Sequence, residues 1–322
     1  MAEKKYLITG ALGFVAPYFI ACLKKHEKNA VILGVDIVEN ETDIDINYLT
    51  LDLTNTAQVE RLINEFQPDY IVHLAGMSSV AKSWKNPAEC VLTNTTAFLN
   101  LVESVRKFNL ETRILSVGSA EEYGIYDIPV KEYFHLHPKN PYSVARVEQE
   151  YLAKLYVDHY DMDIVMTRSF NHIGPKQKTT FVIPSFVTQL VRMKELQTDN
   201  RLYVGNTEVV RDFLDVRDVA EAYYQILKQG ERREVYNVCS GEGIKLLSVI
   251  KMICQKLNVA PELIVDTTRL RSNEIMYLVG DNSKLKEELG WQKSIPLSKT
   301  ISDMIESVEN DEKTALYRSQ LS

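Results

Sequence analysis

Short apolar runs alternate with longer segments of helical periodicity over the first half of the chain. The runs, each of four or five residues, lie at residues 6–9, 31–35, 70–74, 113–117 and 164–167. A continuous apolar run of this length is typical of a strand that is buried on both faces, as in parallel sheets. The alternation of such strands with amphipathic helices therefore predicts an α/β fold with a Rossmann-like, doubly wound parallel sheet.

After about residue 172 this alternation becomes less regular. Pro175, Pro184 and the polar stretch 197–200 interrupt it. We therefore expect a sheet domain over residues 1–172 and a smaller α/β lobe over residues 173–322. No linker rich in Gly, Ser or Pro separates the two halves, so some segments of the second half are expected to return to the sheet.

Composition and charge exclude several classes of function. The 322 residues are 45% hydrophobic and 25% charged, as in ordinary globular proteins. Lys and Arg number 37 and Asp and Glu number 44, which gives a net charge of −7. Both signs are mixed along the chain, which argues against a nucleic-acid partner or an anionic membrane partner. The first apolar run is shorter than the core of a secretory signal, and no run approaches the roughly 18 residues of a spanning helix, so we expect a cytoplasmic protein.

The sequence predicts no bound metal. The four cysteines, at positions 22, 90, 239 and 254, form no CxxC pair and no Cys/His ligand spacing, so they are interpreted as reduced and mostly buried thiols. His73, His135, His137 and His172 have no metal-like spacing either. His73 lies inside an apolar run and is interpreted as a core residue.

A glycine-containing turn follows the first predicted strand. Residues 9–16 read TGALGFVA and lead directly into a helical segment. Gly10 can make the tight turn, Gly13 lets a pyrophosphate approach the backbone, and the helix N-terminus supplies free N–H groups with partial positive charge. A purely structural turn is the alternative, but the strand-to-helix context favours a dinucleotide site. Ala16 occupies the third small position.

An acidic residue at the end of the second strand sets the expected cofactor preference. Asp36 can accept hydrogen bonds from the adenosine ribose hydroxyls. It would repel a 2′-phosphate, and no Arg or Lys follows it before Arg61, so NAD(H) is favoured over NADP(H). A solvated strand-end Asp is the alternative. The residues expected to bind the cofactor are Gly10, Leu12, Gly13, Phe14, Val15, Asp36, Asp52, Leu53, Leu74, Ala75, Gly76, Asn94, Tyr142 and Arg146.

Candidate catalytic groups follow from a second helix start. Asn140 and Pro141 are typical of an N-cap and a first helical position. Tyr142 and Arg146 then lie four positions apart on one face of the predicted helix, where a cation can stabilise a phenolate and suit it for proton transfer. Such a pair occurs by chance in many helices. It gains weight here because Ser119, at the end of the fifth strand, brings a hydroxyl to the same rim.

Together, the glycine turn, Ser119 and the Tyr142-x-x-x-Arg146 pair resemble the extended short-chain dehydrogenase/reductase family, which acts on nucleotide sugars. The resemblance covers nearly the whole chain and implies that Ser119, Tyr142 and Arg146 are catalytic. In that family the last position is usually Lys, which binds the nicotinamide ribose and stabilises the tyrosinate. Arg can supply charge and hydrogen bonds there, with a wider and more rigid head.

The second half resembles the GDP-mannose branch of this family. The segments SFNHIGP (169–175), YVGN (203–206), VRDFLDVRDV (210–219) and LVGD (278–281) match it in order and spacing. The resemblance implies an NAD(P)-binding domain over residues 1–172 and a lobe that mainly binds a GDP-sugar. Arg211 and Arg271 would grip the diphosphate, for which a planar guanidinium is well suited. The residues expected to bind substrate are Ser79, Glu121, Asn171, Val182, Arg211, Arg271 and Glu274.

The reaction implied by the resemblance is reduction of the 4-keto group of GDP-4-keto-6-deoxy-D-mannose by NAD(P)H, giving GDP-D-rhamnose. Tyr142 would protonate the keto oxygen and Ser119 would hydrogen-bond it. A 4-epimerase or 4,6-dehydratase with recycled NAD is the alternative. Glu121 stands where dehydratases place a proton-abstracting carboxylate, but Ala120 replaces its usual polar neighbour, which favours the reductase.

Two further alternatives concern catalysis and assembly. A non-catalytic NAD-binding protein could keep the same fold, but the presence of Tyr142 and Ser119 argues against it. The resemblance also implies a homodimer, formed by the helix over residues 87–107 and the helix that carries Tyr142.

Overall fold

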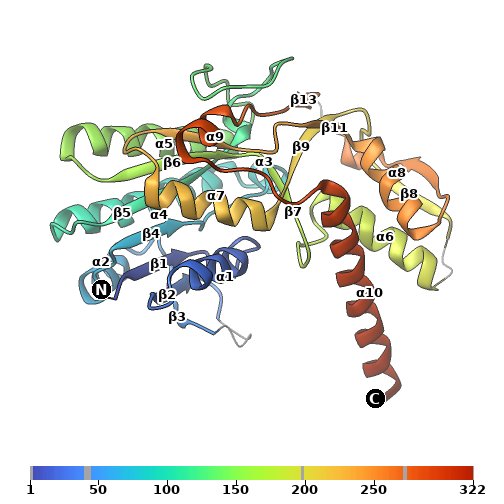
Figure 1. The fold of residues 1–322 in the computed structure, drawn as a ribbon, viewed down its shortest axis with the longest axis horizontal. Helices are drawn as coiled ribbons and strands as arrows, with labels where there is room; N and C mark the ends of the chain where they lie inside the picture. Colours follow the sequence, from blue (N-terminus) through green and yellow to red (C-terminus); the bar gives the residue numbers. More distant parts are fainter. Residues whose placement is uncertain (1–2, 40–44, 197–198, 271–273, 322) are drawn as a thin grey trace.

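A seven-stranded, all-parallel sheet lies at the centre of the larger lobe of the molecule (Figure 1). The computed structural model describes residues 3–39, 45–196, 199–270 and 274–321. In spatial order the strands are β10 (Val235–Val238), β6 (Ile164–Ser169), β5 (Arg113–Ser119), β4 (Tyr70–His73), β1 (Lys5–Thr9), β2 (Val31–Asp36) and β3 (Asn47–Thr50). The predicted doubly wound, Rossmann-like α/β fold is confirmed.

Helices cover both faces of this sheet. Neighbouring strand residues alternate between two cores: Leu7 packs in one, and Tyr6 and Ile8 pack in the other. The core with Tyr6 includes side chains of α1 (Ala16–His26), α7 (Val216–Gln229) and α9 (Ser283–Leu289). The core with Leu7 includes side chains of α2 (Thr56–Phe66), α4 (Pro87–Lys107) and α5 (Pro141–Tyr160). The strands are therefore buried on both sides, as their continuous apolar runs predict.

A second lobe has its own apolar core. Its strands are β7 (Asn171–Ile173), β8 (Arg201–Val204), β9 (Val210–Asp215), β11 (Gly243–Lys245), β12 (Glu262–Val265) and β13 (Tyr277–Leu278). Its helices are α6 (Val182–Leu196), α8 (Leu246–Leu257) and α10 (Leu297–Leu321), and a short turn, η2 (Thr267–Arg269), follows β12. In Figure 1 the C-terminal helix α10 extends away from the sheet at the lower right. No helix of the described residues is long and apolar enough to cross a membrane.

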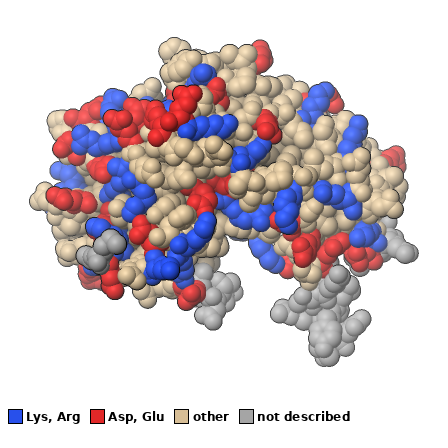
Figure 2. All heavy atoms as spheres, viewed as in Figure 1, with Lys and Arg blue, Asp and Glu red and all other residues tan. Residues whose placement is uncertain are grey.

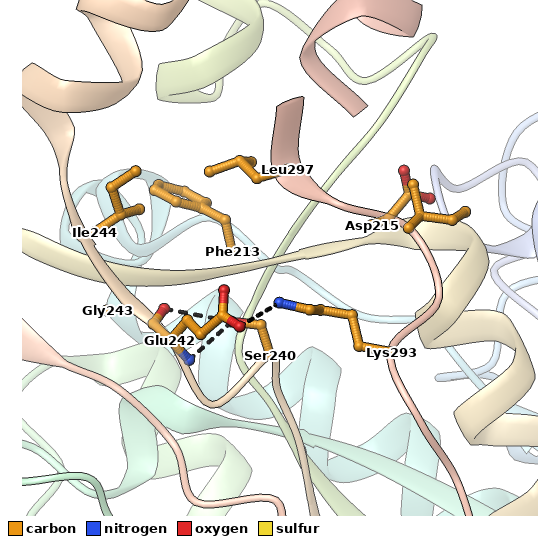
Figure 3. A pocket seen from close by; sticks show the side chains of 9 residues that line it. Phe213, Asp215, Ser240, Glu242, Gly243, Ile244, Lys293 and Leu297 are labelled. Atoms are coloured by element: carbon orange, nitrogen blue, oxygen red, sulfur yellow. Dashed lines mark hydrogen bonds and ion pairs between the residues drawn. The ribbon is translucent and has the colours of Figure 1, made fainter. Parts of the chain in front are cut away.

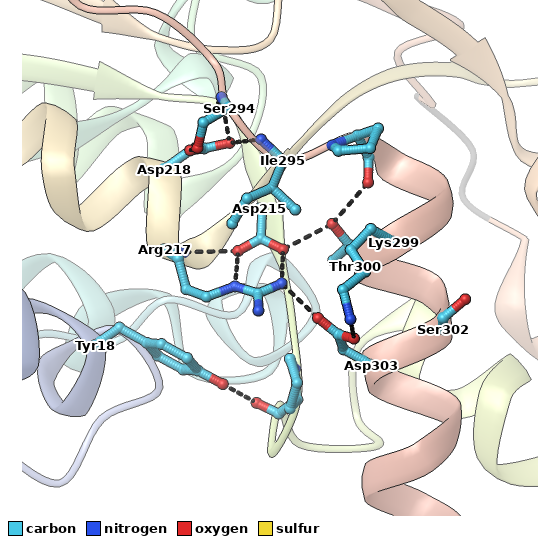
Figure 4. Close-up of polar contacts among 12 residues, drawn as sticks. Tyr18, Asp215, Arg217, Asp218, Ser294, Ile295, Lys299, Thr300, Ser302 and Asp303 are labelled. Carbon is cyan, nitrogen blue, oxygen red and sulfur yellow. Dashed lines mark hydrogen bonds and ion pairs between the residues drawn. The ribbon is translucent and has the colours of Figure 1, made fainter.

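The start of α7 ties the two lobes together (Figure 4). Asp215 at the end of β9 caps α7 by accepting the Arg217 N–H at 2.8 Å, and its buried carboxylate also accepts from the Thr300 hydroxyl of α10 at 2.7 Å. The Arg217 guanidinium bridges Asp215 and Asp303, at 2.7 and 2.8 Å. Because these groups belong to β9, α7 and α10, the network fixes α10 relative to the sheet domain.

Charges of both signs are interspersed over the face shown in Figure 2, as the mixed sequence pattern indicates. On this face Lys and Arg side chains lie next to Asp and Glu side chains rather than gathering into one basic patch.

Candidate active site

The carboxyl ends of the central strands form one edge of the sheet, where the predicted site residues meet. Thr9 at the end of β1 pairs in register with Val35 and His73, and Ser119 at the end of β5 pairs with Ser169 of β6. In an open α/β sheet this edge is where ligands bind. The fold therefore brings the glycine turn and the catalytic candidates to the same side of the molecule.

The glycine turn has the geometry that a pyrophosphate needs. Gly10 has a φ of +69°, and a Cβ added there would lie 2.9 Å from the Ala75 nitrogen. The Gly13 N–H donates to the Gly10 carbonyl at 2.9 Å, and a Cβ on Gly13 would lie 2.9 Å from that same oxygen. Helix α1 starts after Val15 with no side-chain cap, so its first N–H groups are available to an anion. The residues present fit a dinucleotide.

The carboxylate of Asp36 faces this turn. Its Oδ2 accepts the Leu12 N–H at 3.1 Å, and its Oδ1 accepts the Ile37 N–H at 2.8 Å. Each carboxylate oxygen retains capacity for a further hydrogen bond. Asp36 is therefore placed to stabilise the turn and to accept from ribose hydroxyls.

The segment after β4 is held by buried polar groups. The Thr9 hydroxyl accepts the Ala75 N–H at 3.2 Å and lies 2.9 Å from His73 Nδ1. Asn94, fully buried on α4, accepts the Met77 N–H at 2.7 Å and donates to the Met77 carbonyl at 3.2 Å. The side chain of Asn94 thus fixes the backbone that would contact a cofactor.

The other predicted cofactor residues flank these segments. Asp52 accepts the N–H and the hydroxyl of Thr54, both at 2.8 Å, and so stabilises its own turn. The Leu53 side chain is buried. Phe14 stacks on His172, with ring centroids 6.0 Å apart and planes inclined by 13°.

His73 is a neutral core residue, as interpreted from sequence. It is fully buried, and burial together with the nearby Arg146 charge lowers the pKa of His73 to about 3. Its Nε2 has no hydrogen-bond partner among the described residues.

The helix start that carries Tyr142 is confirmed in detail. Asn140 accepts the Ser143 N–H at 2.8 Å, and the Ser143 hydroxyl accepts the Asn140 N–H at 3.1 Å, with Pro141 in the first turn. Tyr142 and Arg146 are both buried, and the guanidinium carbon of Arg146 lies 5.4 Å from the centre of the Tyr142 ring. A phenol and a fixed cation therefore share one buried face of α5.

Ser119 and Glu121 lie beside this helix start. Ser119 ends β5, and its hydroxyl accepts the Glu121 N–H at 3.2 Å within the short turn η1 (Ala120–Glu122). The Glu121 carboxylate accepts from the Asn140 side-chain amide at 3.0 Å, which joins η1 to the first turn of α5. The three predicted catalytic residues thus come from β5 and α5, and the Glu121–Asn140 contact joins the turn after β5 to the start of α5. Ala120 offers no second polar side chain there.

Glu122 is an acidic residue of this region that the sequence did not single out. It is fully buried, and its Oε1 accepts the Ser119 N–H at 2.6 Å. Its Oε2 lies 3.8 Å from Arg168, which pairs more closely with Glu150, at 2.7 Å. Burial and the Glu150 charge raise the pKa of Glu122 well above the usual range of a carboxyl group.

Glu122→Gln should therefore change the pH dependence of stability. A group with a raised folded-state pKa stabilises the protein most below its unfolded pKa, and this contribution is lost as pH rises through the folded pKa. The variant retains an acceptor for Ser119 and has no proton to lose, so its free energy of unfolding should exceed that of the wild type near pH 9 and approach it near pH 4.5. Urea unfolding at both pH values measures this. A constant difference between the proteins would contradict it.

The predicted substrate residues lie on several elements. Asn171 opens β7, and its Nδ2 is buried without a hydrogen-bond partner in the described part of the chain. Arg211 on β9 is partly buried and donates to the Val210 carbonyl at 2.9 Å. Ser79 caps the short helix α3 (Val80–Lys85), accepting the Lys82 N–H at 3.3 Å. Val182 begins α6 with its side chain exposed, Glu274 is half-buried, and Arg271 lies outside the described residues.

A pocket of about 170 Å³ lies beside β9 (Figure 3). It is lined by Phe213, Asp215, Ser240, Glu242, Gly243, Ile244, Lys293, Ile295 and Leu297. An ion pair of 2.7 Å between Lys293 and Glu242 lies within it. None of the predicted cofactor, catalytic or substrate residues lines this pocket, so it is separate from the candidate active site.

Three potential metal ligands meet on the outer helices. Cys22 and His26, one turn apart on α1, and Glu221 of α7 place their ligand atoms within 4.8 Å of one another. This Cys-x-x-x-His spacing was missed in the sequence, because it becomes a pair only on a helix. The Glu221 carboxylate already accepts from Lys25 and His26, both at 2.8 Å.

Comparison with known proteins identifies the family. A family model described as GDP-mannose 4,6 dehydratase matches residues 7–304. The chain is similar to the GDP-6-deoxy-D-mannose reductase of Pseudomonas aeruginosa, with 34% identity over 76% of this chain and 81% of that protein. It is also similar to the GDP-6-deoxy-D-talose 4-dehydrogenase of Aggregatibacter actinomycetemcomitans, with 28% identity over 89% of this chain and 91% of that protein.

A solved structure agrees with these relatives. The structure of RMD from Pseudomonas aeruginosa complexed with NADPH has a TM-score of 0.84 and 30% identity, and the match covers 96% of this chain and all of that chain. The resemblance inferred from the motifs is confirmed, and so is the expectation of an enzyme. The chain belongs to the GDP-mannose 4,6-dehydratase family of extended short-chain dehydrogenases/reductases, and it is an oxidoreductase of that class.

Proposed function

We propose that this enzyme reduces the 4-keto group of GDP-4-keto-6-deoxy-D-mannose to give GDP-D-rhamnose. The observation that carries the proposal is the buried Tyr142–Arg146 pair of α5, in which Arg146 donates to the Val117 carbonyl near the end of β5, the strand that ends at Ser119. The similarity to a GDP-6-deoxy-D-mannose reductase supports the same substrate class. Bound NADH supplies the hydride that reduces C4.

Four residues of this chain transfer the proton, stabilise the developing charge and bind the sugar. Tyr142 delivers a proton to the keto oxygen as negative charge develops there, and the Ser119 hydroxyl donates a hydrogen bond to that oxygen. Arg146 stabilises the phenolate that Tyr142 becomes. Glu121, held by Asn140 at 3.0 Å, hydrogen-bonds the sugar hydroxyls.

Redox stoichiometry tests this reaction. Purified enzyme is incubated with NADH and the 4-keto sugar nucleotide, absorbance of the reduced nicotinamide is followed, and the product is identified by NMR. A reductase consumes one NADH for each product formed. Conversion of GDP-mannose to a 4-keto sugar in a parallel incubation, or epimerisation of a sugar nucleotide, without net oxidation of NADH would replace the reductase with a dehydratase or epimerase.

We propose that NADH is preferred over NADPH, because the Asp36 carboxylate at the end of β2 would repel a 2′-phosphate. The similar Pseudomonas aeruginosa structure carries NADPH, so this preference has a direct test. Asp36→Ser should lower the ratio of kcat/KM for NADH to kcat/KM for NADPH by about tenfold, because the charge that repels the 2′-phosphate is removed. Steady-state kinetics with both cofactors measure the ratio. A wild-type enzyme that already prefers NADPH would contradict the proposal.

We also propose a homodimer through α4 and α5. These helices pack against each other and leave large apolar side chains exposed, including Leu92 at 64%, Tyr151 at 58% and Leu155 at 59%. Large apolar side chains exposed on two helices that pack together favour an interaction surface there. Sedimentation velocity should find a dimer that Leu155→Arg dissociates. A monomeric wild type would contradict this proposal.

A further inference from the structure

Gln149 connects Arg146 to the central sheet through its side-chain amide. Gln149 lies three residues after Arg146 on α5 and is only 1% exposed. Its Oε1 accepts from Arg146 Nη1 at 2.6 Å. Its Nε2 donates to the Ser116 hydroxyl at 2.8 Å and lies 3.4 Å from the Val117 carbonyl. Both ends of the amide are therefore used, one toward the guanidinium and one toward β5.

This contact fixes which way the guanidinium faces. Arg146 Nη1 also donates to the Val117 carbonyl at 3.2 Å, so it points toward β5. Arg146 Nη2 lies 3.0 Å from the position that a Cβ on Gly76 would occupy. Because the guanidinium is planar and rigid, anchoring Nη1 on the strand directs Nη2 toward the backbone after β4. That backbone borders the candidate cofactor site.

The hydrogen bond from Arg146 to the Gln149 amide suits an arginine at position 146 better than a lysine. A lysine ammonium is a compact charge on a flexible stem, and it can turn its donors toward a ligand without a second anchor. A buried guanidinium needs acceptors at fixed positions, and its Nε here already has none among the described residues. A carboxylate at position 149 would neutralise the cation, whereas the Gln149 amide orients it and leaves its charge intact.

We propose that Gln149 is a positioning residue that orients Arg146. It thereby fixes the direction of the N–H groups that Arg146 presents to the ribose of the nicotinamide cofactor and the position of its positive charge next to Tyr142. The proposal deepens the proposed reductase and rests on it. Gln149 itself lies behind Arg146 and does not touch the reacting atoms.

Gln149→Met tests this positioning role, because Met has a similar length and lacks the amide oxygen and the amide N–H groups. We expect the Kd for NADH, measured by fluorescence, to rise about fivefold and kcat to fall about tenfold, as small displacements of a catalytic group cost rate. Gln149→Asn, whose amide is one methylene too short to reach Arg146, should give the same losses if the Met variant folds poorly. The matched control is Glu148→Gln, the exposed neighbour that accepts from Thr95 at 2.8 Å, which should behave as wild type.

The decisive comparison repeats Gln149→Met in the Arg146→Lys background. A lysine ammonium does not depend on the Gln149 amide for its orientation. Adding Gln149→Met to the Arg146→Lys enzyme should therefore change kcat and the Kd by less than about twofold, so the effects of the two substitutions are not additive. Equal losses in both backgrounds, or no loss in either, would overturn the proposal, because a merely structural role for Gln149 does not depend on the residue at position 146.

Cofactor affinity separates this inference from the proposed reaction. If the enzyme fails to reduce the 4-keto sugar nucleotide, the Kd for NADH still reports whether Gln149 orients Arg146. If Gln149→Met leaves that Kd unchanged while the wild type reduces the sugar, the positioning role fails and the reductase remains.

Discussion

Tyr142→Phe should lower kcat by about 10²- to 10⁴-fold, the range expected when a general acid is removed. The cofactor Kd should stay within about twofold. The physical reason is that phenylalanine retains the buried ring against which Arg146 lies at 5.4 Å and lacks only the hydroxyl that carries the proton. Stopped-flow or steady-state oxidation of NADH with the 4-keto sugar nucleotide measures kcat, and fluorescence titration measures the Kd.

A second tyrosine on the same helix provides the control. Tyr160→Phe also removes one hydroxyl from α5, but this side chain is 46% exposed and lies at the far end of the helix, so turnover should be unchanged. Full activity of the Tyr142→Phe enzyme would remove Tyr142 from the mechanism. A loss of cofactor binding in place of turnover would make it a binding residue only.

Much of the fold could be predicted because its signal is local. Strands buried on both faces are continuous apolar runs, and β1, β4 and β6 were found in this way. The edge strand β3 (Asn47–Thr50) was missed, because its side chains are mostly exposed and its sequence shows no apolar run. The opposite edge, β10, comes from the second half of the chain. A long-range pairing of this kind leaves no local pattern.

The candidate site likewise contains residues that have a local sequence signal and residues that have none. Gly10, Asp36, Ser119 and Tyr142 follow from strand ends and helix starts, whose positions the sequence indicates. Residues that act through buried contacts did not stand out. Glu122 and Gln149 are ordinary polar residues in helical segments, and their burial becomes visible only when β5, β6 and α5 are packed together. Asn94 is predicted from the sequence to bind the cofactor, and the buried contact of its side chain with the Met77 backbone is visible only in the structure.

The largest remaining effect is expected at Arg146, where this chain departs from the usual lysine. Arg146 is 5% exposed and donates hydrogen bonds to Gln149 and to the Val117 carbonyl, so it is a buried residue of α5. Its roles require a positive charge next to Tyr142 and a donor toward the cofactor edge. Lysine supplies both, and methionine supplies neither.

Arg146→Lys should therefore keep kcat within about tenfold of the wild type, whereas Arg146→Met should lose about 10²-fold or more, as when one preorganised electrostatic group is removed. Steady-state oxidation of NADH with the 4-keto sugar nucleotide measures kcat for all three enzymes. An active Met variant would mean that Tyr142 needs no cation beside it, and that the buried guanidinium serves only to join α5 to β5.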